Sequence, residues 1–247
     1  MSARRGKSGI RKSTDADLQA IHAWLVDQET RNIPGTFLCN WELTEKCHRE
    51  GKLLVYIDGA SEQPVAYLWD NLGILEVRHD MRRKGIGRKL VEHRIKQAIK
   101  DNECFLYIQC EPTSSVPFWQ RMGFTLLAPK NENTYAYRFL EKEHQLPSDG
   151  VPVNVVIRFF SEDRKRNKNT PARCVATSDA VKTSDGIVHL AERVACFTDP
   201  HQNSGDLVIE VEAAGKILVC DKAKYPIARD IGVQRCDLGF FLDVVRS

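Results

Sequence analysis

The stretch Leu72–Lys100, LGILEVRHDMRRKGIGRKLVEHRIKQAIK, decides how this chain folds. It contains an apolar run over Leu72–Val77, then a basic turn with two glycines over Arg82–Gly87, and then an amphipathic segment. In the last part the apolar residues recur with a period of about 3.6 residues, which is typical of a helix packed on a sheet: Leu90, Val91, Ile95, Ala98 and Ile99. The stretch therefore predicts a strand, a glycine turn and a helix in direct succession.

A strand that enters a glycine turn at a helix N-terminus is suited to bind an anion. The first backbone N–H groups of the helix have no intrahelical partner, and the helix dipole adds a partial positive charge of about half a unit. Gly85 and Gly87 lack Cβ atoms, so the backbone can approach a phosphate closely. Four basic side chains add charge-assisted donors, namely Arg82, Arg83, Lys84 and Arg88. We interpret the turn as a pyrophosphate cradle.

Two motifs in this order resemble the GNAT superfamily of N-acetyltransferases. Arg82-x-x-Gly85-x-Gly87 is similar to the R/Q-x-x-G-x-G/A signature of that family, and Pro117–Phe124, PFWQRMGF, is similar to its short helix and Gly-Phe turn. The resemblance covers roughly residues 8–140. It implies an α+β fold, GNAT-like and mixed, with a mostly antiparallel central sheet flanked by helices. It also implies acetyl-coenzyme A as the acyl donor.

The resemblance further implies roles for individual residues. Backbone groups around Val77–His79 would hold the pantetheine arm, between strands that splay apart, and the basic turn would hold the pyrophosphate. The residues expected to bind the coenzyme are Val77, Arg78, His79, Arg82, Arg83, Lys84, Gly85, Ile86, Gly87, Arg88 and Trp119. The region after the first helix usually shapes the acceptor pocket, so Phe37 and Trp41 are expected pocket walls, with packing in the core as the alternative.

The groups that handle protons depart from the family pattern. Trp119 stands where many members carry a tyrosine as general acid, and an indole N–H does not titrate near neutral pH. The catalytic candidates are Glu76, Tyr107 and Glu111, and Asp70 and His79 are further possibilities. Glu76 has solvent exposure as its alternative, and Glu111 has capping of the short helix near Ser114. Catalysis by proximity alone also stays open.

The remaining elements follow from turn and alternation signals. Thr14 is expected to cap the first helix, with acidic residues in its first turn. Asp58-Gly59 indicates a β-hairpin, and the segment Phe37–Glu50 is expected to be less regular. The expected strands are Ile10–Ser13, Leu53–Ile57, Val65–Trp69, Phe105–Cys110, Thr125–Leu127 and Tyr135–Leu140.

A second, β-rich domain is predicted after a linker. The segment Lys142–Pro152, KEHQLPSDGVP, reads as a linker, so we expect a first domain over residues 1–145, a linker over 146–152 and a small β-rich domain over 153–247. Ala213-Ala214-Gly215 indicates a hairpin turn. The expected strands are Val153–Phe160, Ile187–Phe197, Leu207–Val211, Lys216–Cys220 and Gly239–Val245.

Composition excludes several classes of protein. Charged residues make up 28% and hydrophobic residues 42% of the 247, a soluble globular balance, and no apolar run approaches the ~20 residues of a membrane helix. The start MSARRGKSG lacks the apolar segment of a secretory signal. The eight cysteines form no C-x-x-C pair, which favours reduced thiols in a cytoplasmic protein without a metal.

The sequence argues against nucleic acid as a partner. The net charge is only +3, and the basic clusters Arg4–Lys12 and Arg164–Lys168 carry no interleaved aromatic residues for stacking on bases. Such a charged run is more often a solvated loop.

The function expected from the resemblance is an N-acetyltransferase that moves an acetyl group from acetyl-coenzyme A to an amine, by direct attack of the amine on the thioester. The acceptor class stays open between a small molecule, a peptide or protein, and an aminoacyl-RNA, and a homodimer also stays open. The alternative is a non-catalytic acyl-coenzyme A sensor or scaffold, in which the C-terminal module is the effector.

Overall fold

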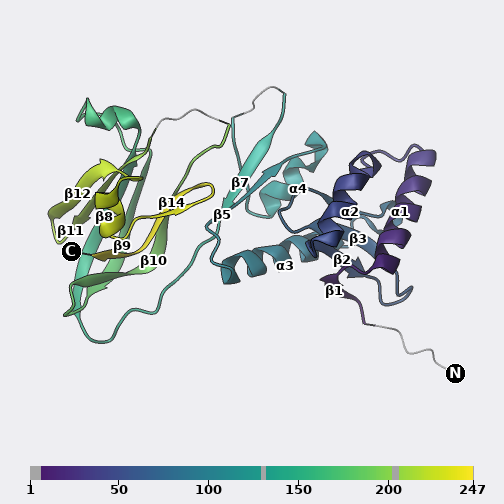
Figure 1. Cartoon of the computed structure of the whole chain (residues 1–247), viewed down its shortest axis with the longest axis horizontal. Coiled ribbons are helices and arrows are strands. Elements are labelled where there is room, and N and C mark those ends of the chain that lie inside the picture. The colour runs from purple at the N-terminus through teal and green to yellow at the C-terminus, as the bar shows by residue number, and fades with distance from the viewer. Residues whose placement is uncertain (1–6, 129–131, 202–205, 247) are drawn as a thin grey trace. The chain divides into compact units, whose positions relative to one another are not determined.

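The computed structural model in Figure 1 describes residues 7–128, 132–201 and 206–246. The described chain forms two compact units. The first runs to Arg138 except for Asn102–Phe105, and that short segment belongs with the residues from Phe139 onward to the second unit. Arg4 and Arg5 of the basic N-terminal cluster lie outside the described residues.

The first unit alternates helices with short strands. In chain order its elements are β1 (Gly9–Lys12), α1 (Asp15–Thr30), a 3-10 turn (Leu38–Asn40), α2 (Trp41–Arg49), β2 (Leu53–Ile57), β3 (Pro64–Trp69), β4 (Leu75–Val77), a second 3-10 turn (His79–Met81), α3 (Ile86–Lys100), β5 (Phe105–Gln109), a third 3-10 turn (Thr113–Ser115), α4 (Val116–Arg121), β6 (Thr125–Leu126) and β7 (Tyr135–Phe139). This order matches the predicted succession of strand, glycine turn and helix over Leu72–Lys100.

Two separate sheets hold these strands, and their edges matter for the site. The larger has the antiparallel order β1-β2-β3-β4, in which Glu76 of β4 lies opposite Tyr67 of β3. The smaller has the order β5-β7-β6. Strands β4 and β5 are therefore edge strands of different sheets and do not pair, as the resemblance implied.

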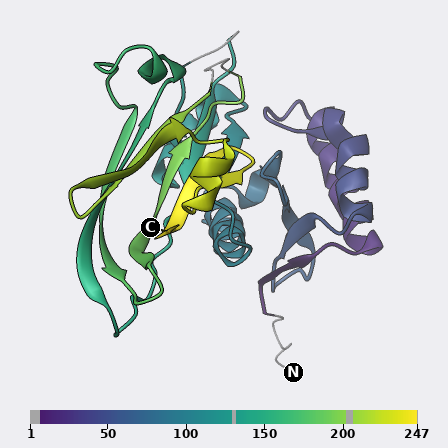
Figure 2. The same ribbon diagram turned by 60° about the vertical axis from the view of Figure 1, so that its left-hand side comes forward.

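Helices cover both faces of the larger sheet (Figures 1 and 2). Helix α1 buries Ile21, Trp24 and Leu25 against β2 and β3, and α3 lies on the other face. The N-terminus of α1 is fixed as the sequence predicted, because Thr14 and Asp17 form a reciprocal capping box. The prediction of an irregular Phe37–Glu50 was wrong, since most of that segment is the helix α2.

The second unit is one curled seven-stranded sheet with the order β12-β11-β8-β9-β10-β14-β13. Its elements are β8 (Val151–Phe160), a 3-10 turn (Glu162–Lys165), β9 (Cys174–Lys182), β10 (Ile187–Phe197), β11 (Val208–Ala213), β12 (Lys216–Lys222), α5 (Pro226–Asp230), β13 (Gln234–Cys236) and β14 (Gly239–Arg246). Its core is apolar and includes Ile157, Phe159, Leu190, Ile209 and Leu242.

The predicted β-rich character of this unit is confirmed. The turn after Ala213 is a tight hairpin in which Ala214 and Gly215 both have positive φ, at 50° and 75°. Strand β9 was not predicted from the sequence. Its inward positions Cys174 and Ala176 are small and its outward positions are partly polar, so the usual alternation of large apolar residues is missing.

The charged run Arg164–Lys168 is only partly a solvated loop. Arg164 forms an ion pair with Glu210 at 3.2 Å and lies over the ring of Phe160 at 4.4 Å. Lys165 pairs with Asp221. Both basic side chains are therefore engaged by the sheet of their own unit.

Candidate functional site

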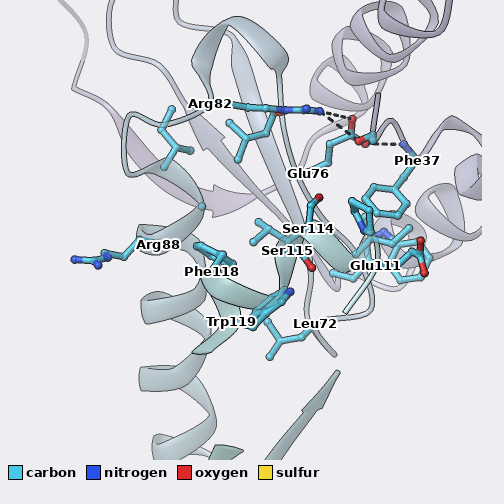
Figure 3. A pocket seen from close by; sticks show the side chains of 18 of the residues that line it. Phe37, Leu72, Glu76, Arg82, Arg88, Glu111, Ser114, Ser115, Phe118 and Trp119 are labelled. Atoms are coloured by element: carbon cyan, nitrogen blue, oxygen red, sulfur yellow. Dashed lines mark hydrogen bonds and ion pairs between the residues drawn. The ribbon is translucent and has the colours of Figure 1, made fainter. Parts of the chain in front are cut away.

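A cavity of about 1180 Å³ lies within the first unit. Its walls come from β4, the loop from β4 to α3, the first turn of α3, the segment before and within α4, and the chain between α1 and α2 (Figure 3). The cavity reaches around the edge strand β4. Since β4 has no partner on that side, both of its faces are accessible from the cavity.

The N-terminus of α3 opens into this cavity. Gly85 is the N-cap residue, and its φ of 77° is a left-handed conformation that a glycine adopts without strain. No side chain caps the helix, and the first hydrogen bond of the helix runs from Lys89 N–H to the carbonyl of Gly85 at 3.1 Å. The N–H groups of Ile86, Gly87 and Arg88 thus precede the helical ladder at the cavity wall.

Gly87 leaves a narrow space between β4 and α4. A Cβ built at Gly87 lies 3.7 Å from a side-chain carbon of each of three neighbours, Leu75, Val77 and Phe118. These are ordinary van der Waals contacts, so a small side chain would fit the folded chain and take up cavity volume. Because Gly87 has no side chain, the backbone at the start of α3 is open to the cavity, where a phosphate would meet its N–H groups.

The basic residues of the turn differ in what they do. Arg83 and Arg88 are exposed and line the cavity. The exposed His79 and the buried Ile86 line it as well. Lys84 and Arg78 are not among the lining residues. Lys84 Nζ contacts Met81 Sδ at 3.3 Å, and Arg78 pairs with Asp80 at 2.7 Å.

Arg82 is held by main-chain carbonyls. Its Nε donates to the carbonyl of Val77 at 3.0 Å, its Nη1 to that of Pro34 at 3.1 Å and its Nη2 to that of Gly35 at 3.3 Å. Its guanidinium also lies 4.0 Å from the carboxylate of Glu76. The guanidinium therefore joins the end of β4 to the chain between α1 and α2 (Figure 3).

Glu76 is buried, with 2% of its surface exposed, although it lines the cavity. The alternative that it faces solvent was therefore wrong, because its face of β4 lies under α1 and Phe37. Its carboxylate accepts hydrogen bonds from Gln28 Nε2 at 3.1 Å, from the Phe37 N–H at 3.0 Å and from the Tyr67 hydroxyl at 3.2 Å. Burial raises the pKa of Glu76, and these hydrogen bonds oppose the rise.

Gln28 is a site residue that the sequence analysis did not identify. It is 2% exposed on α1, and its Oε1 accepts from the backbone N–H of His79 at 2.6 Å while its Nε2 donates to Glu76. The available signal was its spacing, since Gln28 continues the apolar face of Ile21, Trp24 and Leu25. A polar residue on a buried helix face needs a buried partner.

The other catalytic candidates are spread more widely. Glu111 is exposed and lines the cavity. Neither short helix after it begins with a side-chain cap, so the alternative that Glu111 caps a helix is wrong. Tyr107 stacks on Tyr135, with ring centroids 5.6 Å apart, and is not among the lining residues. Asp70 forms an ion pair with the buried Arg94 at 3.2 Å.

The aromatic candidates also separate. Phe37 lines the cavity, whereas Trp41 does not and packs on His22 with ring centroids 4.6 Å apart, so Trp41 follows the alternative of packing. Trp119 lines the cavity but is only 6% exposed, in edge contact with Phe118 and Phe124. Leu72 lines the same cavity (Figure 3).

Within the described ranges no group of three or more His, Cys, Asp or Glu side chains could hold a metal ion. No helix there is long and apolar enough to cross a membrane.

A comparison with protein families matches residues 18–124 to the model described as the acetyltransferase (GNAT) family. That region holds β4, the glycine turn, α3 and α4, and with them most of the cavity walls. A comparison with curated protein sequences gave no match.

Among solved structures, this chain is similar to a GNAT acetyltransferase from Staphylococcus aureus Mu50, at 18% identity and a TM-score of 0.43 over 54% of this chain and 99% of that one. A PaiA N-acetyltransferase from Thermoplasma acidophilum, in complex with coenzyme A, gives 15% identity and a TM-score of 0.44 over 54% and 99%. The ribosomal-protein-S18-alanine N-acetyltransferase of Escherichia coli gives 16% and 0.43 over 54% and 94%.

Proposed function

We propose that the protein is an N-acetyltransferase that uses acetyl-coenzyme A and acetylates an amine, since residues 18–124 match the model of the acetyltransferase (GNAT) family. The observation that carries this proposal is the uncapped N-terminus of α3 beside the space at Gly87. The helix N-terminus supplies N–H donors for a pyrophosphate, and the cavity along β4, about 1180 Å³ in volume, supplies room for a pantetheine arm.

The edge strand β4 would orient the donor. Acetyl-coenzyme A supplies a thioester whose carbonyl carbon the amine attacks. Leu75 and Val77 present one face of β4 to Gly87 and Phe118. The free edge of β4 offers main-chain donors and acceptors to an extended chain laid beside it, except for the Val77 carbonyl, which already accepts from Arg82.

Glu76 would accept the proton of the amine. An alkyl ammonium has a pKa near ~10.4, so an amine bound at neutral pH has to lose a proton before it can attack. A carboxylate has about four lone-pair positions, and Glu76 uses three of them for the hydrogen bonds described above. Its raised pKa brings it nearer to neutral pH, where a general base works best.

Two other residues would have lesser roles. Glu111, as an exposed carboxylate at the wall, would attract an incoming ammonium ion. Trp119 has no titratable proton and would only form part of the wall, so the leaving thiolate would take its proton from water or from the amine itself.

The first test is calorimetric titration with acetyl-coenzyme A of the intact protein and of Gly87→Val. The Cβ of the new side chain makes ordinary contacts and its two methyl groups occupy the space beside β4, so we expect acetyl-coenzyme A affinity to fall at least about a hundredfold. A cooperative thermal unfolding transition checks that the variant is folded.

Lys96→Val is the matched control, because it places the same β-branched residue on an exposed position of α3 and should leave affinity unchanged. If folded Gly87→Val binds acetyl-coenzyme A with unchanged affinity, the interpretation of the turn as a pyrophosphate cradle is wrong. Thiol release against pooled amines then decides between an enzyme and an acyl-coenzyme A sensor.

A further inference from the structure

The two faces of β4 divide the cavity. Leu75 and Val77 face Gly87 and Phe118 on the α3 side, while Glu76, between them, points to the opposite side, toward Phe37. The α3 side suits the coenzyme in the proposed function. The side of Glu76 is left for the acceptor.

Three apolar side chains form the wall on the side of Glu76. Phe37, Leu43 and Trp69 all line the cavity, and they come from the chain before the 3-10 turn Leu38–Asn40, from α2 and from β3. Leu43 is 52% exposed on α2, so its side chain offers apolar surface that a bound group could cover. The indole N–H of Trp69 is already bonded to Thr44 Oγ1 at 3.3 Å, so its ring offers apolar surface.

Within this wall, the position of Phe37 is fixed by hydrogen bonds to Arg82 and Glu76. Arg82 holds the carbonyls of Pro34 and Gly35, and Glu76 holds the N–H of Phe37. The planar guanidinium of Arg82 donates in three directions at once, so its orientation is set and it is not free to turn toward a phosphate without breaking these bonds. A wall held in this way does not have to be ordered when an acceptor binds.

We propose that Phe37, Leu43 and Trp69 form an acceptor subsite for a primary amine carried on an apolar body, and that Arg82 is a positioning residue for this subsite. The proposal rests on the proposed function, since it names the acceptor class of the same site. The exposed carboxylate of Glu111 lines the same cavity as Phe37 and complements the positive charge of the amine. Sequence analysis placed Arg82 with the coenzyme, and the subsite gives it a different role.

The test compares thiol release from acetyl-coenzyme A with two amine probes, 2-phenylethylamine and ethanolamine. Burial of the phenyl group should give 2-phenylethylamine a kcat/KM at least about tenfold higher. Leu43→Asn should raise the KM for 2-phenylethylamine about fivefold, leave ethanolamine unaffected, and leave acetyl-coenzyme A affinity by calorimetry unchanged. Val26→Asn is the control, because Val26 is 40% exposed on α1 and is not among the lining residues.

Arg82→Gln tests the positioning role. It should raise the KM for 2-phenylethylamine about tenfold and speed hydrogen exchange at the Phe37 amide, while the Kd for acetyl-coenzyme A stays within about twofold. Arg88→Gln should do the reverse, weakening acetyl-coenzyme A with little change in the KM for the amine. A loss of coenzyme affinity in Arg82→Gln with the amine KM unchanged would overturn the positioning role.

The subsite and the proposed function fail in different ways. Equal turnover of the two probes, or no thiol release with either while acetyl-coenzyme A still binds, would overturn the subsite and leave the coenzyme site standing. Absence of acetyl-coenzyme A binding to the intact protein would overturn both.

Discussion

Asp17 shows how one side chain fixes a helix start and an ion pair together. It is 5% exposed, completes the capping box with Thr14, and accepts from Arg11 Nη2 at 3.0 Å. Burial would raise the pKa of Asp17, but the hydrogen bonds from Arg11 and Thr14 outweigh burial and lower it. The charged form is therefore the one that the fold favours.

For Asp17→Asn we expect the free energy of unfolding at pH 7 to fall by about 1–2 kcal/mol, because a cap and a charged partner are lost together. A lowered pKa in the folded state means that this stabilisation is present above the ordinary aspartate pKa and disappears as pH falls through the lowered value. Urea unfolding at pH 7 and at pH 2 measures the loss of unfolding free energy and its dependence on pH. Asp27→Asn, at a 60% exposed pair with Arg31, should change little at either pH.

Glu76 carries the second prediction at this scale. If its carboxylate accepts the amine proton, kcat/KM for the amine rises with pH through the pKa of Glu76, which burial places above the ordinary glutamate value. Glu76→Gln should lower kcat by about 10²–10⁴ and remove that acidic limb. Glu111→Gln should keep the acidic limb of the pH profile. A limb that persists in Glu76→Gln would assign the base elsewhere.

At the scale of elements, α4 meets the glycine turn of α3 through aromatic packing. Trp119 is 6% exposed, and its ring centroid lies 5.0 Å from that of Phe118 and 5.3 Å from that of Phe124. Phe118 in turn reaches the space at Gly87. Packing therefore accounts for an aromatic residue at this position without a chemical role.

Trp119→Phe should change kcat less than about threefold, because the apolar contacts largely persist and no titrating group is lost. Steady-state thiol release measures kcat, and calorimetry measures coenzyme affinity in parallel. A loss of several orders of magnitude with coenzyme affinity intact would contradict a packing role. Phe124→Leu serves as a matched packing change in the same cluster.

At the scale of the whole molecule, the segment Asn102–Phe105 belongs to the second unit although the residues on both sides of it in the sequence belong to the first. Arg193, whose side chain is 1% exposed, forms an ion pair with Asp243 at 2.7 Å and donates to Asn102 Oδ1 at 2.7 Å and Cys104 Sγ at 3.3 Å. The second unit thus includes residues from far upstream in the sequence.

We therefore expect a fragment of residues 139–247 to unfold at lower urea concentration than the same sheet in the full chain, since Arg193 loses partners while it stays buried. Arg193→Met should cost about 3–5 kcal/mol in the full chain and less in the fragment. Circular dichroism measures the unfolding transition of the fragment and that of the full chain. Equal midpoints for fragment and full chain would show that Asn102–Phe105 contributes nothing.

The sequence by itself determined the features that depend on a few neighbouring residues. The cap at Thr14, the turn at Gly85 and the hairpin at Ala214 each need particular residues at particular backbone angles, and those preferences act locally. Helix α3 was predictable for the same reason, because its apolar residues recur with the helical period within one continuous segment.

Only the tertiary structure decided the chemistry around Glu76. Its partners Gln28 and Phe37 stand 48 and 39 residues away in the sequence, and the carbonyl of Pro34 stands 48 residues from Arg82. Burial of a carboxylate and the partners of a guanidinium depend on which segments the fold brings together, and no local pattern specifies that. The physical reason is that backbone preference acts over a few residues, whereas desolvation and hydrogen bonding act through space.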